Sequence, residues 1–387
     1  MKRLAVITTH PIQYYAPVFR LLSKCLQIKV FYTWGEKSIE SKFDPGFGKV
    51  VKWDLPLLED YPYEFMENIS SDPGSHHFNG IKNPDLIKKI IDFAPDDILI
   101  YGWAYSSHLR ALRYFKNKIP IWFRGDSTLE DSDFEPRKLL RYFFLRWVYG
   151  FVDHAFFVGT ANKRYYKKFG LSEEQLHFAP HAVDITRFQS DRADEAQELR
   201  AKYNIGKQDI LILFAGKLEP KKDPEILLDA FSNLEQNNTH LLFAGDGVLK
   251  QKLLEKRKNS HKEQRIHFLE FQNQQQMPVL YQACDLFCLP SKGPGETWGL
   301  AVNEAMACGK TILISDKVGC SEDLVIEGYN GAIFKHGSAS QLQEKIIHLT
   351  DVKELEKMGQ NSLAIIKEWT LEKQVSTIEK CLKLDAK

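Results

Sequence analysis

Two carboxylates and several glycines are concentrated in the stretch GPGETWGLAVNEAMACGK, residues 293–310. Glu296 lies in a loop, and Glu304 lies in the helix that the sequence predicts from about Gly299. A helix start offers free N–H groups and a positive dipole end, which suit phosphate. A carboxylate further along the helix can accept hydrogen bonds from a diol, so the stretch fits an anionic ligand with hydroxyl groups. A surface acid followed by an acid on an ordinary amphipathic helix fits this stretch equally well.

A second stretch, LFAGKLEPKKDPEILLDAF at residues 213–231, contains a basic loop between a predicted strand and a predicted helix. The strand ends at Gly216, and Lys217 and Lys222 follow it. Two lysines in one such loop form a compact positive site that can neutralise a departing diphosphate. The alternative is a solvated basic turn.

The elements that must position these residues form two series. Short apolar segments alternate with helical patterns, and the strand candidates are residues 3–9, 28–34, 97–103, 119–125, 154–159 and 176–180, then 209–216, 240–245, 266–271, 286–291 and 310–315. Continuous apolar strands spaced by helices are typical of parallel sheets covered on both faces. The polar stretch 190–208 separates the two series. We therefore expect an α/β chain with two Rossmann-like domains and a boundary near residues 186–207, with ligands beyond the carboxyl ends of the strands.

Two further regions complete this organisation. Residues 34–83 are rich in proline, glycine and aromatic residues and show little periodicity, which predicts an irregular insertion near a cleft or a long connection. Residues 368–384 predict a final helix after the second sheet is complete.

Composition excludes several classes of protein. The formal net charge of the 387 residues is +1, so no global field favours nucleic acid. The six cysteines form no C-x-x-C pair, which indicates reduced thiols and neither disulfides nor a zinc site. The chain has no run of roughly 18 apolar residues, and its first apolar run is too short for a signal peptide. We expect a cytoplasmic protein, with contact to the inner face of a membrane left open.

The stretch RKLLRYFFLRWVYGF, residues 137–151, interleaves basic and aromatic residues. It fits either a face that meets anionic lipid or a lipid-linked acceptor, or a core helix with a basic solvent edge. We favour the core helix, since a helix before a buried strand usually packs on the sheet.

The ordered motifs of the C-terminal half resemble those of the retaining, nucleotide-sugar-dependent glycosyltransferases of family 4, which have the GT-B fold of two Rossmann-like domains facing across a cleft. The matching residues are Gly216-Lys217-Leu218 with Lys222, Gly245-Asp246-Gly247, Pro290-Ser291, and the E-x7-E pair Glu296 and Glu304, continued by Ala305-Met306-Ala307-Cys308-Gly309. The resemblance covers roughly residues 209–335. Upstream, PHAVDITRF at residues 180–188 resembles the family's turn before the interdomain linker, with His181 and Ala182 in place of Asn and Gly.

The resemblance implies roles for these residues. Glu304 would bind the ribose hydroxyls, Glu296 would contact the transferred sugar, and Lys217 and Lys222 would hold the diphosphate. The donor-binding set comprises Gly216, Gly245, Phe271, Trp298, Gly299, Leu300 and Glu304. Lys217 stands where the family usually has Arg. A lysine cannot form the two parallel hydrogen bonds that an arginine forms with a phosphate, but it keeps the positive charge. The segment 270–272 would read the base edge, and the choice between uracil and guanine stays open.

The N-terminal half matches the family less closely. A Gly-rich loop is replaced by THPIQYYAP, residues 9–17, where His10 and Gln13 are candidates for the acceptor side. Arg124 and Asp126 stand where the family commonly has a His, and they are candidate catalytic residues. The D-x-D sequence at residues 131–133 is interpreted as a polar loop, and no metal ligands are assigned.

Together with the other observations, this resemblance implies a retaining glycosyltransferase, and we expect it to need neither a metal nor a cofactor. Residues 1–186 would bind a glycan or lipid-linked acceptor, residues 207–369 would bind a UDP- or GDP-sugar, and a helix at about 370–387 would pack back on the first domain. Surface polysaccharide or glycolipid assembly is the expected setting. Two alternatives stay open: a nucleotide-sugar epimerase or hydrolase of the same fold, and an inactive nucleotide-sugar-binding module. Dinucleotide-dependent redox chemistry is disfavoured, because no G-x-G-x-x-G follows the first strand.

Overall fold

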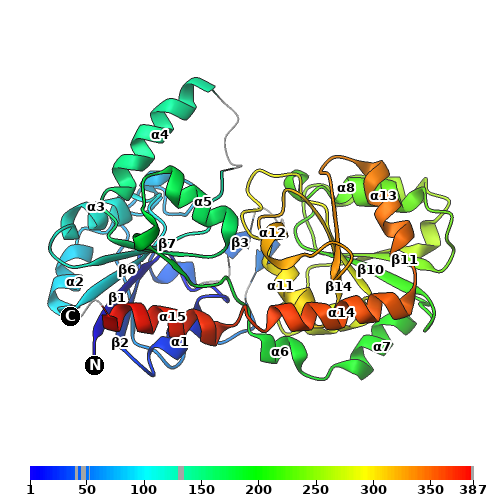
Figure 1. Ribbon diagram of the computed structural model, residues 1–387, viewed down its shortest axis with the longest axis horizontal. Helices are drawn as coiled ribbons and strands as arrows, with labels where there is room; N and C mark the ends of the chain where they lie inside the picture. Colours follow the sequence, from blue (N-terminus) through cyan, green and yellow to red (C-terminus); the bar gives the residue numbers. More distant parts are fainter. Residues whose placement is uncertain (40–41, 45–48, 52, 130–134, 385–387) are drawn as a thin grey trace. The chain divides into compact units, whose positions relative to one another are not determined.

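The computed structural model describes the chain except for residues 40–41, 45–48, 52, 130–134 and 385–387. The chain divides into two compact units (Figure 1). The first unit contains Met1–Lys42, Leu55–Ala182 and Leu371–Lys387, and the second contains Phe43–Asp54 and Val183–Thr370.

A seven-stranded sheet forms the centre of the first unit, and its strand order is β5-β2-β1-β6-β7-β8-β9. The strands are β1 Arg3–Thr8, β2 Gln27–Tyr32, β5 Tyr63–Phe65, β6 Asp97–Tyr101, β7 Ile121–Arg124, β8 His154–Phe157 and β9 Leu176–Phe178. All neighbours pair in parallel; Val6 of β1, for example, lies opposite Val30 of β2 and Leu99 of β6. The carboxyl ends of these strands therefore share one edge of the sheet.

Helices cover both faces of this sheet, because alternate side chains of each buried strand point to opposite faces. The helices are α1 Ala16–Leu22, α2 Leu86–Phe93, α3 Ser106–Phe115, α4 Glu135–Tyr149, α5 Thr160–Lys168 and α15 Leu371–Leu384, with the short 3-10 helices η1 Glu36–Ser38, η2 Phe78–Gly80 and η3 Glu173–Gln175. Ile7 of β1 faces the core that includes Leu112 of α3. Val6 faces a second core, which Phe19 of α1 shares with Ile378 of α15. The last helix of the chain thus belongs to the first unit (Figure 1).

The second unit contains a six-stranded parallel sheet with the order β12-β11-β10-β13-β14-β15. Its strands are β10 Ile210–Ala215, β11 Thr239–Ala244, β12 Ile266–Leu269, β13 Leu286–Leu289, β14 Thr311–Ser315 and β15 Gly331–Phe334; β3 Lys42–Asp44 and β4 Lys49–Val51 form a separate two-stranded sheet. Its helices are α6 Ile185–Gln189, α7 Ala193–Lys202, α8 Pro224–Ser232, α9 Lys250–Lys258, α10 Met277–Ala283, α11 Leu300–Ala307, α12 Ser321–Leu324, α13 Ala339–His348 and α14 Val352–Ile366, with η4 Pro220–Lys222 and η5 Glu263–Arg265.

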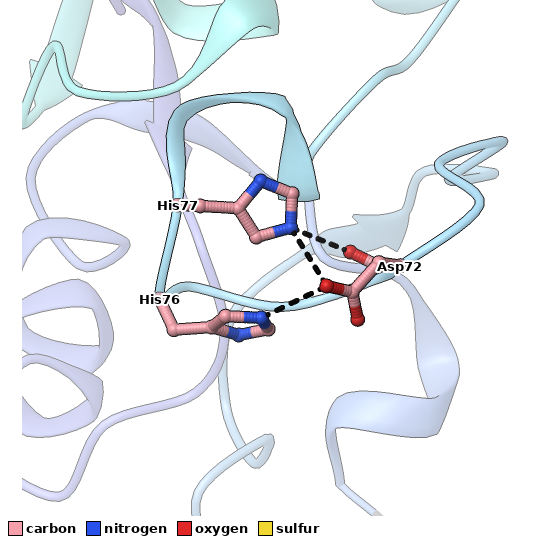
Figure 2. Close-up of side chains that lie close together, drawn as sticks. All are labelled: Asp72, His76 and His77. Carbon is pink, nitrogen blue, oxygen red and sulfur yellow. Dashed lines mark hydrogen bonds and ion pairs between the residues drawn. The ribbon is translucent and has the colours of Figure 1, made fainter.

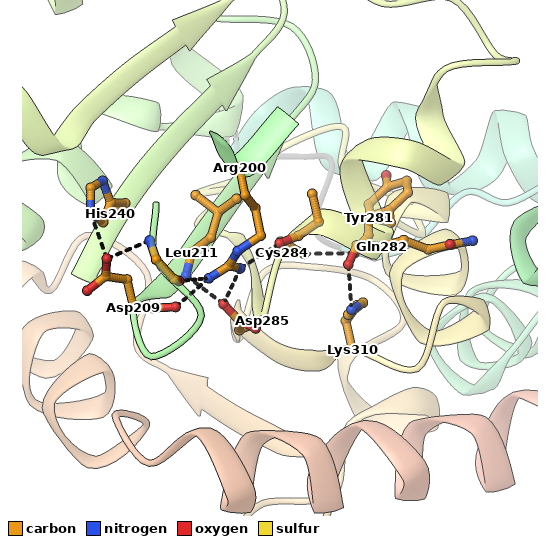
Figure 3. Close-up of polar contacts among 11 residues, drawn as sticks. Arg200, Asp209, Leu211, His240, Tyr281, Gln282, Cys284, Asp285 and Lys310 are labelled. Carbon is orange, nitrogen blue, oxygen red and sulfur yellow. Dashed lines mark hydrogen bonds and ion pairs between the residues drawn. The ribbon is translucent and has the colours of Figure 1, made fainter. Parts of the chain in front are cut away.

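A polar network closes the amino end of the second sheet (Figure 3). The guanidinium of Arg200 on α7 donates to the carbonyl oxygen of Ala283 at 2.8 Å and to Asp285 Oδ2 at 2.9 Å. Asp285 Oδ2 also accepts the backbone N–H of Leu211 in β10 at 2.7 Å. The network satisfies backbone groups at the starts of the strands, which fixes this end of the sheet. The loops at the opposite end, after the strands, are available to form a binding site.

The predicted fold class is confirmed: the chain is α/β with two parallel Rossmann-like sheets. Every strand segment expected from the sequence contains a strand, whereas β3, β4, β5 and β15 were not predicted. β5 is three residues long and β15 begins with a glycine, so neither shows the apolar run that identified the others. The region 34–83, expected to be irregular, also contributes Phe43–Asp54 to the second unit.

The interpretation of α4 as a core helix with a basic solvent edge is wrong in one respect. Leu145 and Val148 are fully buried, as a core helix requires, but Leu140 and Phe143 are 75% and 61% exposed. The sequence is apolar around much of the helix, so periodicity could not show which apolar side packs on the sheet.

Two further expectations concern membrane spans and cysteines. No helix among the described residues has the length and apolar character needed to cross a bilayer. All six cysteines are free thiols; Cys284, Cys288 and Cys320 are buried, and the other three are half-buried.

Candidate functional site

The loops after β10 and β11 are locked together by glycines at the carboxyl edge of the second sheet. A Cβ atom on Gly245 would lie 2.0 Å from the carbonyl oxygen of Gly216, so a side chain at this position would force the two loops apart. Leu218 donates its N–H to the carbonyl oxygen of Asp246 at 2.9 Å. The basic loop at residues 216–223 is therefore held in one place.

Lys222 and Glu296 meet above this edge. Lys222 Nζ lies 2.6 Å from Glu296 Oε2, and the Ser291 hydroxyl donates to the same oxygen at 3.0 Å. The two charged side chains are only 16% and 9% exposed. Since Lys222 follows β10 and Ser291 follows β13, the cluster joins two loops of adjacent strands.

Four further lysines lie in the loops after β10, β13 and β14: Lys217, Lys221, Lys292 and Lys317. Carboxylates offset part of the charge. Lys292 Nζ lies 3.4 Å from Asp223 Oδ1, and Lys221 Nζ lies 3.4 Å from Glu219 Oε1. Burial raises the pKa of Asp223 even though Lys292 acts to lower it. Several basic side chains therefore lie in the loops at this edge, and they could bind an anionic ligand.

The start of α11 lies directly after the same loop. Gly299 caps the helix with φ +95°, and a Cβ there would lie 2.7 Å from Val318 Cγ1. The loop after β14 fixes this turn, because Gly319 donates its N–H to the carbonyl of Glu296 at 3.0 Å and Cys320 donates to that of Trp298 at 2.9 Å. The first turn, beginning at Leu300, thus presents a fixed set of N–H groups.

Glu304 lies inside α11 and is 3% exposed. The hydroxyl of Tyr281 on α10 donates to Glu304 Oε2 at 2.8 Å. This hydrogen bond helps to hold the buried carboxylate in place. Trp298 has a packing environment instead: its indole N–H donates to Asn303 Oδ1 at 2.8 Å, and its ring lies 5.2 Å from that of Trp369.

The loop expected to read the base is held by Asp246 and by a distant part of the sequence. Asp246 Oδ2 accepts the backbone N–H of Phe271 at 2.9 Å, while its Oδ1 pairs with Lys250 at 2.6 Å. The ring of Trp53, which belongs to the second unit, lies 6.2 Å from the ring of Phe271. Asp54 Oδ2 accepts the N–H of Gln275 at 3.1 Å. Residues 53–54 therefore form part of the surroundings of this loop.

The first unit holds His10 and Gln13 in the turn after β1. His10 Nδ1 lies 2.8 Å from the Thr9 hydroxyl, and its ring meets the ring of Trp34 edge-on at 5.1 Å. Gln13 is half-buried before α1.

Arg124 at the end of β7 is 2% exposed and donates to the carbonyl oxygens of Ala179 and Pro180 at 2.9 and 3.1 Å. These bonds give it a positioning role for the chain that leaves the first unit. Burial, with a smaller contribution from Arg124, lowers the pKa of His181 to about 3.

Asp126 affects a nearby tyrosine. Burial raises the pKa of Tyr15, and the negative charge of Asp126 raises it further. The hydroxyl of Tyr101 at the end of β6 is buried without a hydrogen-bond partner among the described residues. Phenols and a carboxylate therefore gather at the carboxyl edge of the first sheet.

The structure also brings together three potential metal ligands that the sequence analysis did not identify: Asp72, His76 and His77 (Figure 2). The Nε2 atoms of His76 and His77 lie 3.1 and 3.2 Å from Asp72 Oδ2. Asp72 and His76 are exposed, and His77 also bonds to the Asp72 carbonyl oxygen at 3.0 Å. The D-x-D sequence at residues 131–133 lies outside the described residues.

Residues 195–363 match the family of glycosyl transferases group 1. The second unit carries a glycosyl transferases group 1 domain. In sequence, the chain is 31% identical over 182 residues to the uncharacterized glycosyltransferase MJ1178 of Methanocaldococcus jannaschii, covering 46% of this chain and 47% of that protein. The match therefore spans about half the length of that relative. A second protein of the same organism, the uncharacterized glycosyltransferase MJ1069, is 25% identical over 84% of each chain.

Solved structures show the same two-unit fold. Anabaena Alr3699/HepE in complex with UDP superposes with a TM-score of 0.75 and 21% identity, covering 99% of this chain and all of that one. The expected GT-B fold is thus confirmed, and the family resemblance of the C-terminal half is confirmed at the level of group 1.

Several residues of the second unit complete the candidate site but were not identified from the sequence. They are Trp53, Asp54, Tyr281, Lys292 and Lys317. Lys292 directly follows the Pro290-Ser291 motif, so it could have been predicted from the sequence. Trp53 lies far from the motifs in the chain, and Tyr281 lies on a helix between two of them, so only folding brings their side chains to the site.

Proposed function

We propose that this chain is a retaining glycosyltransferase that moves a sugar from a UDP- or GDP-sugar to a glycan or lipid-linked acceptor. The observation that carries the proposal is the contact of Lys222, Glu296 and Ser291 at the carboxyl edge of the second sheet. Lys217 and Lys222 would hold the diphosphate together with the N–H groups at the start of α11. Residues 207–369 bind the donor in this proposal, and residues 1–186 with the C-terminal helix bind the acceptor.

The nucleoside end of the donor would lie along α11 and the loop at Phe271. Glu304 would accept hydrogen bonds from the ribose hydroxyls, because a carboxylate can accept several hydrogen bonds besides the one that it accepts from the Tyr281 hydroxyl. The base would lie against Phe271 with Trp53 beside it, as their ring distance of 6.2 Å supports. Alr3699/HepE was solved with UDP and with UDP-glucose, which makes UDP-sugars the first donors to test.

Glu296 would orient the sugar and would not attack it. Its Oε2 already accepts from Lys222 and Ser291, which lowers its reactivity as a nucleophile. The acceptor hydroxyl would approach on the face that the diphosphate leaves, and a leaving phosphate oxygen would take its proton. Retention of configuration follows without a covalent sugar intermediate.

We place the reaction in the cytoplasm and in surface polysaccharide or glycolipid assembly. Six free thiols are consistent with a reducing compartment. Arg124 and Asp126 remain candidates for acceptor-side chemistry, and the bonds of Arg124 to backbone carbonyls favour a positioning role.

The test is nucleotide release from a panel of UDP- and GDP-sugars, measured with and without an extract that contains acceptor. Release that requires the extract supports transfer. Release without it would favour the hydrolase or epimerase, and binding without release would favour the inactive module. Either of these two results contradicts the proposal.

A further inference from the structure

Helix α4 of the first unit has two apolar sides. On one side, Leu145, Val148 and Tyr149 are buried in the core of the unit. On the other side, five apolar residues are exposed: Leu139 by 62%, Leu140 by 75%, Phe143 by 61%, Phe144 by 40% and Trp147 by 44%. We refer to these five residues as the α4 apolar face. The first turns of the helix project away from the rest of the unit (Figure 1).

The spacing of these residues makes the α4 apolar face continuous. They stand at positions i, i+1, i+4, i+5 and i+8, which fall within a sector of about 140° at 100° per residue. The rings of Phe144 and Trp147 are 5.7 Å apart. Contiguous apolar surface of this kind on a soluble protein usually marks a binding surface.

A groove lies beside this face and shares Trp147 with it. Its volume is about 590 Å³, and it is lined by Ile87, Arg110, Arg113, Tyr114, Trp147 and Phe151. The guanidinium carbon of Arg113 lies 5.6 Å from the centroid of the Trp147 ring. Within the described part of the chain, neither Arg110 nor Arg113 forms an ion pair with a carboxylate. Both guanidiniums can therefore bind phosphate oxygens.

The described charges on α3 and on residues 139–149 all have the same sign. The described side chains of α3 and of residues 139–149 include Arg110, Arg113, Arg141 and Arg146 and no acid. The whole chain carries only +1, so these cations are a local concentration. Two copies of this face would bring arginines together without carboxylates to pair with them, whereas an anionic lipid surface supplies the opposite charge.

We propose that the α4 apolar face and the groove of Arg110 and Arg113 bind the surface of an anionic phospholipid bilayer. The apolar and aromatic side chains enter the boundary between headgroups and acyl chains, and the two guanidiniums bind lipid phosphates. This inference is independent of the transfer reaction, because lipid binding is measured without donor or acceptor.

The test is flotation of the full-length protein with vesicles of phosphatidylcholine alone and of phosphatidylcholine mixed with phosphatidylglycerol. Wild type should float with the anionic vesicles and release at high salt. Leu140→Ser/Phe143→Ser should abolish flotation. Arg110→Gln/Arg113→Gln should weaken binding to the anionic vesicles by roughly 25-fold, about fivefold for each charge, and should leave binding to neutral vesicles unchanged.

Matched controls use residues of similar exposure elsewhere. Ile326 and Ile347 are 54% and 40% exposed, and Ile326→Ser/Ile347→Ser should float as wild type does. Lys353→Gln/Lys357→Gln removes the same charge from exposed positions of α14 and should retain the affinity. Brominated anionic lipid should quench wild-type tryptophan emission more than that of Trp147→Phe, which tests the site without removing its apolar surface.

Three outcomes would overturn the proposal. The first is wild type that does not float with anionic vesicles, and the second is Leu140→Ser/Phe143→Ser that floats as well as wild type. The third is a wild-type dimer in light scattering that Leu140→Ser/Phe143→Ser converts to monomer, which would assign the face to a second copy of the chain.

Discussion

Lys222 Nζ lies 2.6 Å from Glu296 Oε2 and joins the loop after β10 to the loop before α11. Both side chains are largely buried, so removing either one leaves the charge of the other without its partner in a buried environment. The pair therefore fixes the geometry of the loop. A bound diphosphate would offer Lys222 a second anionic partner. Lys222 is therefore held close to the place where the proposed leaving group would depart.

The first prediction concerns turnover. Lys222→Met should lower kcat by about 10²–10³-fold, because one positive donor to the departing diphosphate is lost. Binding of the free nucleoside, which has no phosphate, should change little. The measurement is steady-state nucleotide release with saturating donor, beside calorimetry with the nucleoside.

Lys221→Met is the matched control, because its neighbour Glu219 lies 3.4 Å away and its side chain is 42% exposed. It should retain kcat within a few fold. The double variant Lys222→Met/Glu296→Gln should be less impaired than the product of the single effects, since the two residues are in contact. Wild-type turnover in Lys222→Met would remove it from the leaving-group site.

The second prediction concerns the ribose contact. Glu304→Ala should weaken UDP binding more than Glu304→Gln, because the amide oxygen of Gln can still accept a hydrogen bond. Each lost bond to the charged group should cost about 1.5–3 kcal/mol.

Tyr281→Phe removes the hydroxyl that donates to Glu304 at 2.8 Å and keeps the ring. It should weaken UDP binding less than Glu304→Ala, because the carboxylate remains. Calorimetry with UDP measures all three variants. Equal affinity of wild type and Glu304→Ala would show that Glu304 does not contact the nucleotide.

Much of this site could be predicted because its residues lie in ordered local motifs. The end of a strand, a glycine and the start of a helix can be recognised in the sequence. They allowed the positions of Gly245, Glu296 and Gly299 in the fold to be predicted. The partner of Glu304 could not be predicted, because Tyr281 projects from a neighbouring helix. Trp53 reaches Phe271 only because a segment of the first half of the sequence joins the second unit.

The buried side of α4 could not be predicted from the sequence, for a different reason. Burial of Leu145 and exposure of Leu140 depend on which side of the helix meets the sheet. Both sides are apolar, so the amino-acid pattern contains no information that would distinguish them. The fold was easier to predict, since each long strand is apolar throughout and each is flanked by a helix.

The third prediction concerns metal ions and stereochemistry. Lysines and the start of α11 supply positive charge at the leaving group, so we expect most of the activity to remain in excess chelator. His76→Asn/His77→Asn removes two ligands of the exposed cluster in Figure 2 and should leave turnover unchanged. Proton NMR of the early product from an α-linked donor should show an α linkage. Activity that chelator abolishes and magnesium restores, or a β-linked product, would require a different arrangement of the site.

The fourth prediction concerns stability at acid pH and follows from His108 in α3. The ring is fully buried; its Nδ1 lies 2.9 Å from the carbonyl oxygen of Gly102, and its Nε2 lies 2.8 Å from the hydroxyl of Thr33. Since a carbonyl can only accept, Nδ1 carries a proton and donates it to Gly102, while the Thr33 hydroxyl lies between Nε2 and the carbonyl oxygen of Thr8, 3.0 Å from the latter. Burial lowers the pKa of His108 from about 6.5 to about 4, against the opposing effect of its backbone hydrogen bonds.

Between these two pKa values, the unfolded chain binds a proton at this position that the folded chain does not. The contribution of His108 to the free energy of unfolding should therefore be constant above about pH 6.5 and fall by up to about 1.4 kcal/mol per pH unit towards pH 4. His108→Gln should reduce this slope, whereas His261→Gln, at an exposed position, should leave it unchanged. Urea unfolding at a series of pH values, followed by hydrogen exchange of peptides from β1 and β6, measures the slope for the first unit. An equal slope in wild type and His108→Gln would show that this histidine is not responsible for the loss of stability in acid.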